Sequence, residues 1–203
     1  VKNHNIPKLI VPGSAAQYAC NQGVVDGIGP ASPSDLYSAT KTACYDFCKV
    51  LCNKYGIQLV WTLITSVYGP GRDDNNLISY TIKSLLLGRC PSYTKLEQQW
   101  DFLYINDLSK ALYLLAKSNL KHQIYPIGSG SSKKMIEYVT IIRDFIDSNL
   151  SLGIGDLPYK NSIVDNQVMD ISALETDTGF KVDYTFERGI ARTIEYFKQI
   201  HAN

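Results

Sequence analysis

One arrangement dominates this sequence: two short apolar segments flank a single long helical segment. Residues 8–11 and 57–65 are rich in β-branched and other apolar side chains, which predicts two buried strands. Between them, Ser34 or Asp35 can cap a helix that runs to about Tyr55, and a glycine follows as its stop signal. Two strands joined by one helix of this length form a parallel βαβ unit. The sequence therefore predicts an α/β fold.

The rest of the chain continues the alternation of strands and helices. Residues 19–33 and 150–167 are rich in turn-forming or polar residues and are expected to be irregular. We expect a mixed second lobe after about Gly69. The later elements that the pattern predicts are strands at 102–105 and 123–127, and helices at 75–87, at 107–117 led by Asp107, from Ser131 or Ser132 to 146, and at 186–200.

Composition excludes several classes of protein. The chain has 203 residues, 45% of them apolar, which suits one sizeable domain or a domain with a lobe. A formal net charge of +1 gives no basic patch, so we expect no nucleic-acid partner. No run approaches about 18 consecutive apolar residues, and the first residues do not resemble a signal peptide. We therefore expect no membrane association.

Cysteine usage points to a reducing compartment. Five cysteines are an odd number without a secretory signal, which indicates reduced thiols and a cytoplasmic location. Cys44, Cys48 and Cys52 are four residues apart and share one helix face. This stripe is either a metal or redox cluster, or a set of small side chains on a packed face. Zinc motifs bring a second pair of ligands, which this sequence does not supply, so we expect no metal.

A Tyr four residues before a Lys is chemically useful, because positions i and i+4 share a helix face. An adjacent ammonium favours the phenolate and lowers the pKa of the phenol, which then exchanges protons with a hydroxyl. The spacing alone is weak evidence, since it occurs at 37/41, 45/49 and 113/117. Tyr37 stands in the first turn of its helix, directly after a Pro-rich loop, and can face a cleft at the carboxyl end of the sheet. We therefore choose Tyr37 and Lys41.

Ser14 strengthens this choice, because it stands just past the end of the preceding strand. That position belongs to the same edge of the sheet, where a hydroxyl can hold a substrate oxygen and share its proton. Without Tyr37 and Lys41, a turn-forming role for Ser14 would be an equally good interpretation.

Four sequence blocks occur in a fixed order along the chain. They are residues 14–18 (SAAQY), 33–41 (PSDLYSATK), 66–71 (SVYGPG) and 101–107 (DFLYIND), and residues 170–190 add a matching ending. Together they resemble the extended short-chain dehydrogenases/reductases, the NAD-dependent epimerase/dehydratase family. The resemblance implies a Rossmann-like, doubly wound parallel sheet. Residues 1–69 would form its later part, with the N-terminal half missing, and residues 70–203 mainly a smaller mixed α/β substrate lobe with segments that return to the sheet.

The resemblance also implies roles for individual residues. Ser14, Tyr37 and Lys41 match the family's catalytic triad, and Lys41 would also bond the nicotinamide ribose of NAD or NADP. Ser66 and Val67 match the strand end that lies against the nicotinamide. The implied substrate-binding residues are Ala15, Asn76, Leu77 and Tyr104, with Lys160 as a candidate for phosphate charge. Asn76 is equally well explained as a simple helix cap.

Two departures from the family pattern matter. Members usually place an Arg before the Asp-Phe block, where it grips a phosphate, but here Trp100 stands there. A Trp cannot neutralise phosphate, so Lys160 or Arg89 would have to supply the charge. The family's glycine-rich loop, which cradles the cofactor pyrophosphate, is not found in this sequence. Because the chain also begins at Val1 and soon enters an apolar run, we expect it to be a segment of a longer protein that carries the activity.

The reaction remains open between two alternatives. Family dehydratases carry an acidic residue just after the position of Ser14, where this chain has Ala15 and Ala16, so dehydration is not expected. A triad of this kind serves both 4-epimerisation and 4-ketoreduction of a nucleotide-linked sugar. A non-catalytic sugar-nucleotide-binding or regulatory subunit is a further alternative, against which the intact triad argues. The resemblance also implies a homodimer through the helix that carries Tyr37.

Overall fold

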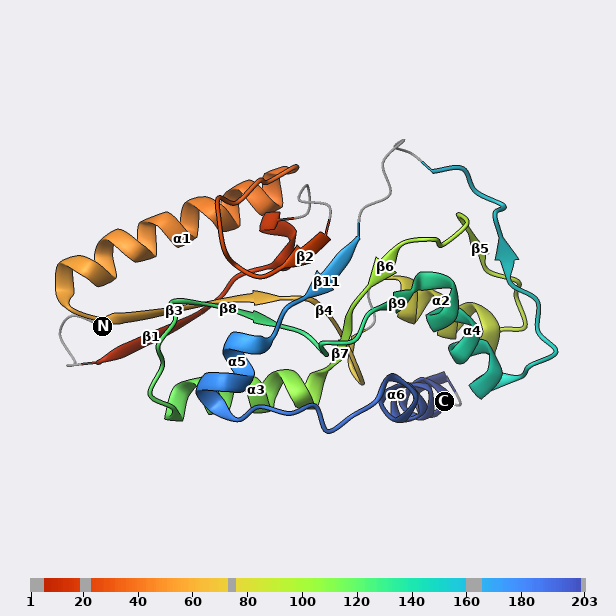
Figure 1. The fold of residues 1–203 in the computed structure, drawn as a ribbon. Coiled ribbons are helices and arrows are strands. Elements are labelled where there is room, and N and C mark those ends of the chain that lie inside the picture. The colour runs from red at the N-terminus through yellow and green to blue at the C-terminus, as the bar shows by residue number, and fades with distance from the viewer. Residues whose placement is uncertain (1–5, 19–22, 73–75, 160–165, 202–203) are drawn as a thin grey trace.

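The computed structural model of this chain describes residues 6–18, 23–72, 76–159 and 166–201. Its centre is a parallel sheet of β1 (Lys8–Pro12), β3 (Gln58–Ile64) and β8 (Ile124–Ile127), in the order β1-β3-β8. Helix α1 (Leu36–Tyr55) covers one face of the sheet, and α3 (Ile105–Lys117) with α5 (Ser172–Thr178) covers the other (Figure 1). The predicted α/β class and the Rossmann-like arrangement are therefore confirmed.

The predicted βαβ unit is present almost residue for residue. Asp35 caps α1, and its carboxylate accepts a hydrogen bond of 2.7 Å from the backbone N–H of Ser38. The Ser38 side chain in turn accepts from the Asp35 N–H at 3.1 Å, which completes a capping box. Gly56 ends the helix in the left-handed conformation, with φ of 63°, where a residue without a Cβ is favoured. Strands β1 and β3 then pair in parallel, Ile10 opposite Val60.

The predicted irregular stretches contain short elements that the pattern did not reveal. β2 (Gly23–Val25) lies in the first, directly after which the chain becomes irregular, and a 3-10 helix, η2 (Ala15–Tyr18), comes just before that stretch. β10 (Gly153–Ile154) lies in the second, and β11 (Gln167–Met169) begins at its last residue. β2, β11, β6 (Gln99–Trp100) and β9 (Lys133–Lys134) form a second sheet in the order β2-β11-β6-β9. Strands of two or three residues are too short to show alternation, so tertiary pairing rather than local pattern defines them.

Two predicted helix starts were wrong. Helix α3 begins at Ile105, and Asp107 lies within its first turn, where its buried carboxylate accepts from the backbone N–H groups of Asp183 and Tyr184 at 3.0 and 3.1 Å. Asp107 therefore does not cap α3, but holds the segment just before the last helix against it. Helix α4 (Met135–Ile146) has Lys134 as its N-cap residue, because β9 occupies the positions directly after Ser131 and Ser132.

The C-terminal lobe packs three helices around an aromatic core. They are α2 (Leu77–Leu86), α4 and α6 (Phe186–His201), and two parallel strand pairs flank them: β4 (Ser66–Tyr68) with β7 (Phe102–Tyr104), and β5 (Ser92–Tyr93) with β10. The rings of Phe102, Tyr138 and Phe186 meet with centroids 4.6 to 6.3 Å apart. Such tilted and edge-to-face pairs add about 0.5–1.5 kcal/mol each beyond the burial of their surface.

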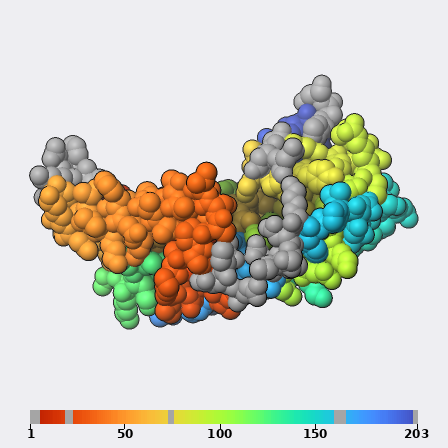
Figure 2. All heavy atoms as spheres, turned by 90° about the horizontal axis from the view of Figure 1, so that it is seen from above, coloured from red at the N-terminus to blue at the C-terminus, as the bar shows by residue number. Residues whose placement is uncertain are grey.

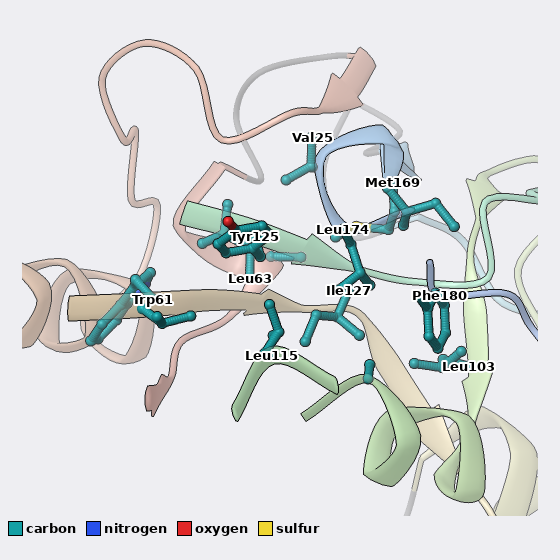
Figure 3. Close-up of a cluster of buried hydrophobic side chains, with 14 of the residues drawn as sticks. Val25, Trp61, Leu63, Leu103, Leu115, Tyr125, Ile127, Met169, Leu174 and Phe180 are labelled. Carbon is teal, nitrogen blue, oxygen red and sulfur yellow. The ribbon is translucent and has the colours of Figure 1, made fainter. Parts of the chain in front are cut away.

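The main core lies around the central sheet, and Figure 3 shows its side chains converging from both faces. Trp61 and Leu63 of β3 and Tyr125 of β8 are almost wholly buried there. Burying an apolar side chain of this size stabilises the fold by about 1.5–3 kcal/mol. The Trp61 indole N–H also donates to Gln17 Oε1 at 3.0 Å, which leaves no unpaired donor in the core at this point and ties η2 to the sheet.

Helix α1 exposes a band of large apolar side chains. Leu36, Phe47 and Val50 are 88%, 70% and 68% exposed. The cysteine stripe on the same helix runs from exposed Cys44 through half-buried Cys48 to buried Cys52. In the described ranges no group of three or more His, Cys, Asp or Glu side chains could hold a metal ion. None of the described helices is long and apolar enough to cross a membrane.

Candidate active site

A cleft of about 470 Å³ opens where the parallel strands β1 and β3 end and β4 begins. Its second side comes from β6 and β11, and Figure 2 shows the molecule notched between the N-terminal part and the C-terminal lobe. Ligands of open α/β sheets bind outside the carboxyl ends of the strands, so the cleft has the expected place for a substrate. Its lining residues are Pro12, Gly13, Ser14, Ala16, Tyr37, Lys41, Ile64, Thr65, Ser66, Val67, Arg72, Trp100 and Gln167.

The three residues of the predicted triad all line this cleft. Tyr37 and Lys41 come from the first turns of α1, with the Lys41 Nζ 5.9 Å from the centre of the Tyr37 ring. The Lys41 ammonium donates to the Pro12 carbonyl at 2.9 Å, and Tyr37 is 56% exposed. Ser14 follows β1 and is partly buried. Two hydroxyls and one cation from segments more than 20 residues apart thus face one space.

The position of Ser14 is set by the turn around it. The Gly13 N–H donates to the Thr62 carbonyl at 2.8 Å, which continues the pairing of β1 with β3 past the strand end. The Ser14 hydroxyl accepts from the Ala16 N–H at 3.2 Å, and the Ser14 N–H donates to Gln17 Oε1 at 3.2 Å. The Ser14 side chain therefore has the turn-forming role that was the alternative interpretation, and its residue also lines the cleft.

The two other Tyr-Lys pairs lie elsewhere. Tyr45 packs edge-on against Trp61, with centroids 5.3 Å apart, and its hydroxyl donates to Gln123 Oε1 at 3.3 Å. Tyr113 is 57% exposed on α3, with the Lys117 ammonium 4.8 Å from its ring centre. Neither tyrosine lines the cleft. Because all three lysines lie close to their tyrosine rings, location rather than spacing separates the pairs.

Ser66 and Val67 lie on β4 and line the cleft next to Trp100. The Trp100 indole N–H donates to the Ser66 hydroxyl at 3.0 Å, so this part of the wall is an indole fixed to a strand end. The position where relatives are expected to hold a phosphate-binding Arg is therefore occupied by an uncharged, half-buried ring.

Sequence reasoning missed Arg72, a second cation among the described residues that line the cleft. Arg72 lines both the cleft and a smaller cavity beside Asn76, and its guanidinium donates to the Val67 carbonyl at 2.5 Å. The expected Lys160 lies outside the described residues, and exposed Arg89, just past α2, lines neither cavity. The signal for Arg72 was its place in the turn directly after the Gly-Pro-Gly block.

The predicted substrate-binding residues do not lie together in the structure. Asn76 is the N-cap of α2, and its side-chain amide oxygen accepts from the backbone N–H groups of Ile78 and Ser79 at 2.9 and 3.1 Å. Leu77 is half-buried and packs in the lobe core. Ala15 and Tyr104 are 1% and 4% exposed, and each lies in one of the two cores. The structure therefore does not bring these two side chains to the cleft, which the Ala16 methyl lines instead.

Gln167 is a second lining residue that sequence reasoning missed, because it lies at the end of a stretch predicted to be irregular. It is 7% exposed, and its Oε1 is 3.1 Å from the Thr65 hydroxyl. That hydroxyl has one proton, and its shorter contact, 2.6 Å to the Asp101 carbonyl, is the one to which it donates. Burial raises the pKa of the Asp101 carboxyl, which nevertheless accepts from the N–H groups of Ser129 and Gly130 behind the cleft.

The chemistry of the lining fits the nicotinamide end of a dinucleotide. Lys41 and nearby hydroxyls can bond a ribose, and Val67 offers an apolar contact for a ring. No carboxylate is among the described residues that line the cleft. The arrangement can therefore exchange a proton through Tyr37, but it holds no described acidic side chain that could protonate a leaving hydroxyl.

The sequence matches the profile of a known family. The description of that family is "NAD dependent epimerase/dehydratase family", and the match covers residues 1–128. Among curated proteins, dTDP-glucose 4,6-dehydratase of Shigella flexneri is 28% identical over 176 residues, which is 82% of this chain and 48% of the relative. The chain thus spans about half the length of the curated relatives it matches.

Solved structures agree with this placement. UDP-N-acetylglucosamine 4-epimerase from Methanobrevibacter ruminantium M1, in complex with UDP-N-acetylmuramic acid, is 28% identical with a TM-score of 0.88, and the match covers 98% of this chain and 65% of that one. UDP-glucuronic acid 4-epimerase from Bacillus cereus, in complex with NAD, is 19% identical with a TM-score of 0.88, over 98% and 64% of the two chains. At that identity the second likeness shows the fold alone.

Proposed function

This chain belongs to the NAD dependent epimerase/dehydratase family, and on that premise we propose that the full-length protein is an NAD(P)-dependent nucleotide-sugar epimerase or 4-ketoreductase. The observation that carries the proposal is the meeting of Ser14, Tyr37 and Lys41 in one cleft at the carboxyl end of the parallel sheet. Nucleotide sugars named in the relatives' descriptions support the substrate class.

The proposed roles follow from the side chains. The Tyr37 phenol exchanges a proton with a sugar hydroxyl, because it is the exposed acid-base group of the cleft. The Ser14 hydroxyl holds the same sugar oxygen. The Lys41 ammonium, anchored on the Pro12 carbonyl, places a positive charge beside the Tyr37 ring and bonds the cofactor ribose.

NAD or NADP is the proposed cofactor. When bound, a nicotinamide accepts or donates the hydride that accompanies proton exchange at the sugar. Lys41, Tyr37, Ser66 and Val67 would hold its nicotinamide end. The pyrophosphate end calls for the glycine-rich loop that this sequence does not contain, so the proposal concerns the full-length protein.

The cleft favours epimerisation or ketoreduction over dehydration, although curated relatives are dehydratases. Elimination of water requires an acid at the leaving hydroxyl. The two residues after Ser14 are alanines, of which Ala15 is buried in the core and Ala16 lines the cleft. No acidic side chain from the described part of the chain supplies that acid in the cleft. The other two reactions need the triad and a nicotinamide, without a further acidic side chain.

The second candidate is a non-catalytic subunit that binds a sugar nucleotide. Arg72 and the uncharged wall at Trp100 are compatible with binding alone. The candidate gives no physical reason for a Tyr, a Lys and a Ser to converge on one cleft, so we rank it second.

A mass-spectrometric screen of the full-length protein tests the proposal. The protein is incubated with the oxidised or the reduced form of NAD or NADP and a panel of UDP- and dTDP-linked sugars and keto-sugars, and stereoisomers are separated by chromatography before mass analysis. Interconversion of stereoisomers at constant mass identifies an epimerase, and a gain of two hydrogens with cofactor consumed identifies a ketoreductase. Loss of water would instead identify a dehydratase, and retention of nucleotide sugar without turnover would favour the binding subunit.

We also propose a homodimer formed through α1. Support comes from the exposed band of Leu36, Phe47 and Val50, which would be costly to leave in water. Light scattering of the full-length protein and of its Phe47→Glu variant measures the mass directly. A dimer that becomes a monomer in the variant supports the proposal, and a monomer in both contradicts it.

A further inference from the structure

Trp100 and Gln167 stand opposite each other on neighbouring strands. They are register partners in the parallel pairing of β6 with β11, although they are 67 positions apart in the chain, and Figure 1 shows the two strands side by side between the central sheet and the lobe. Both side chains line the cleft that holds Tyr37 and Lys41. The two residues therefore form one two-residue wall of that cleft, which we call the Trp100–Gln167 wall.

The indole half of this wall is held rigidly. Its N–H donates to the Ser66 hydroxyl at 3.0 Å, and the Trp100 carbonyl accepts from the Tyr138 hydroxyl at 2.9 Å. The backbone is paired on its other side with Lys133 of β9. With strands on both sides and the ring nitrogen engaged, the ring presents a fixed apolar surface.

The amide half is also oriented. Gln167 is 7% exposed, and its side-chain amide lies 3.1 Å from the Thr65 hydroxyl. Its NH₂ group carries two donors, for which the described part of the chain supplies no partner. A nearly buried amide with N–H donors to spare is suited to donate to an oxygen of a ligand in the cleft.

The chemistry of the wall identifies the part of the ligand that it contacts. An indole cannot neutralise a phosphate, and an amide carries no charge, so a diphosphate has no counter-charge here. An apolar ring face beside hydrogen-bond donors fits a pyranose, which has C–H groups on its faces and hydroxyls at its rim. The Arg72 guanidinium lines the same cleft and suits the anionic part of a nucleotide sugar.

We propose that the Trp100–Gln167 wall is the sugar-positioning surface of the site. The pyranose packs on the indole, the Gln167 amide donates to a ring hydroxyl, and the wall thereby sets which carbon faces Tyr37. The inference rests on the proposed function, and it names the residues that select the sugar. Trp100 and Gln167 are positioning residues and take no part in the proton exchange.

The test compares ligands with and without a sugar. Calorimetry on the full-length protein measures the Kd of UDP-glucose and dTDP-glucose, and of UDP and dTDP as sugar-free counterparts. The sugar used is one whose nucleotide-linked form binds the unaltered protein. Trp100→Ala and Gln167→Leu are each expected to raise the Kd of this nucleotide sugar about tenfold, and the Kd of the sugar-free nucleotide less than about twofold. Trp100→Phe keeps a ring and should restore most of the affinity. Tyr113→Phe, on an exposed ring outside the cleft, is the matched control.

Specific outcomes overturn the inference. Equal weakening of nucleotide and nucleotide sugar would place the nucleotide on the wall, and weakening of NADH binding alone would place the cofactor ring there. Unchanged affinities in Trp100→Ala and Gln167→Leu, with thermal unfolding as for the unaltered protein, would show that the wall is structural. If Trp100→Ala does not fold, Trp100→Phe and Gln167→Leu decide. Absence of any nucleotide-sugar binding by the unaltered protein would overturn the proposed function together with this inference.

Discussion

Gly13 lies against the indole of Trp61 so closely that no side chain fits between them. A Cβ at Gly13 would collide with the Trp61 ring and come within 2.6 Å of the Thr62 carbonyl oxygen. Both are almost wholly buried, so neither can yield cheaply. Gly13→Ala is therefore expected to destabilise the protein by about 2 kcal/mol and to displace Ser14, which follows it. Urea unfolding measures the first effect and turnover the second, and an unchanged unfolding midpoint would contradict this packing.

The second prediction concerns Asp177 of α5. Its side chain is fully buried and accepts from the Tyr125 hydroxyl at 2.6 Å and the Lys121 N–H at 2.8 Å, with His122 Nδ1 at 2.9 Å. Burial alone would raise the pKa of Asp177, but these hydrogen bonds outweigh it and hold the pKa well below its usual range. The carboxylate thus ties α5 to the segment that leads into β8.

Asp177→Asn is expected to lower the free energy of unfolding by about 2 kcal/mol at neutral pH. A depressed pKa in the folded state stabilises the protein above the unfolded value, near 4, and that contribution is lost as pH falls toward the folded value. The gap between the unaltered protein and the variant should therefore be constant at neutral pH and shrink below about pH 4. Unfolding curves across this pH range test it, and a gap that stayed constant into acid would refute the assignment.

The third prediction concerns phosphate charge. Arg72→Ala is expected to weaken UDP or dTDP binding by the full-length protein about tenfold, with a weaker dependence on salt, because the variant loses the guanidinium that lines the cleft. Arg72→Lys should keep part of the affinity. Arg89→Ala removes an exposed arginine that lines neither the cleft nor the cavity beside Asn76, so it serves as the matched control. Equal losses in the two alanine variants would point to a general charge effect instead.

The parts of the fold that could be predicted are those written in local sequence. The cap at Asp35, the stop at Gly56 and the apolar strands on either side follow from neighbouring residues, and so does the i, i+4 placement of Tyr37 and Lys41. The convergence of Ser14 with that pair followed from the rule that parallel strands end at the same edge.

The parts that could not be predicted depend on long-range pairing. The apposition of Trp100 and Gln167 joins strands of two and three residues, which carry no alternation of their own. Asp107 resembled a helix cap by its place in the sequence, yet it bonds backbone groups 76 and 77 residues away. Arg72 lay in a turn, where no periodicity marks which side chains face a cleft.

The measurement that tests the central claim most directly is the turnover of a nucleotide sugar by the full-length protein and its Tyr37→Phe variant, with Tyr113→Phe as the matched control. Removing one hydroxyl from the cleft should reduce turnover by about 10²–10⁴-fold while thermal unfolding stays unchanged, because proton exchange is lost and the Tyr37 ring is more than half exposed. Tyr113→Phe should turn over as the unaltered protein does. Turnover in Tyr37→Phe equal to that of the unaltered protein would contradict the assignment of Tyr37 and, with it, the proposed mechanism.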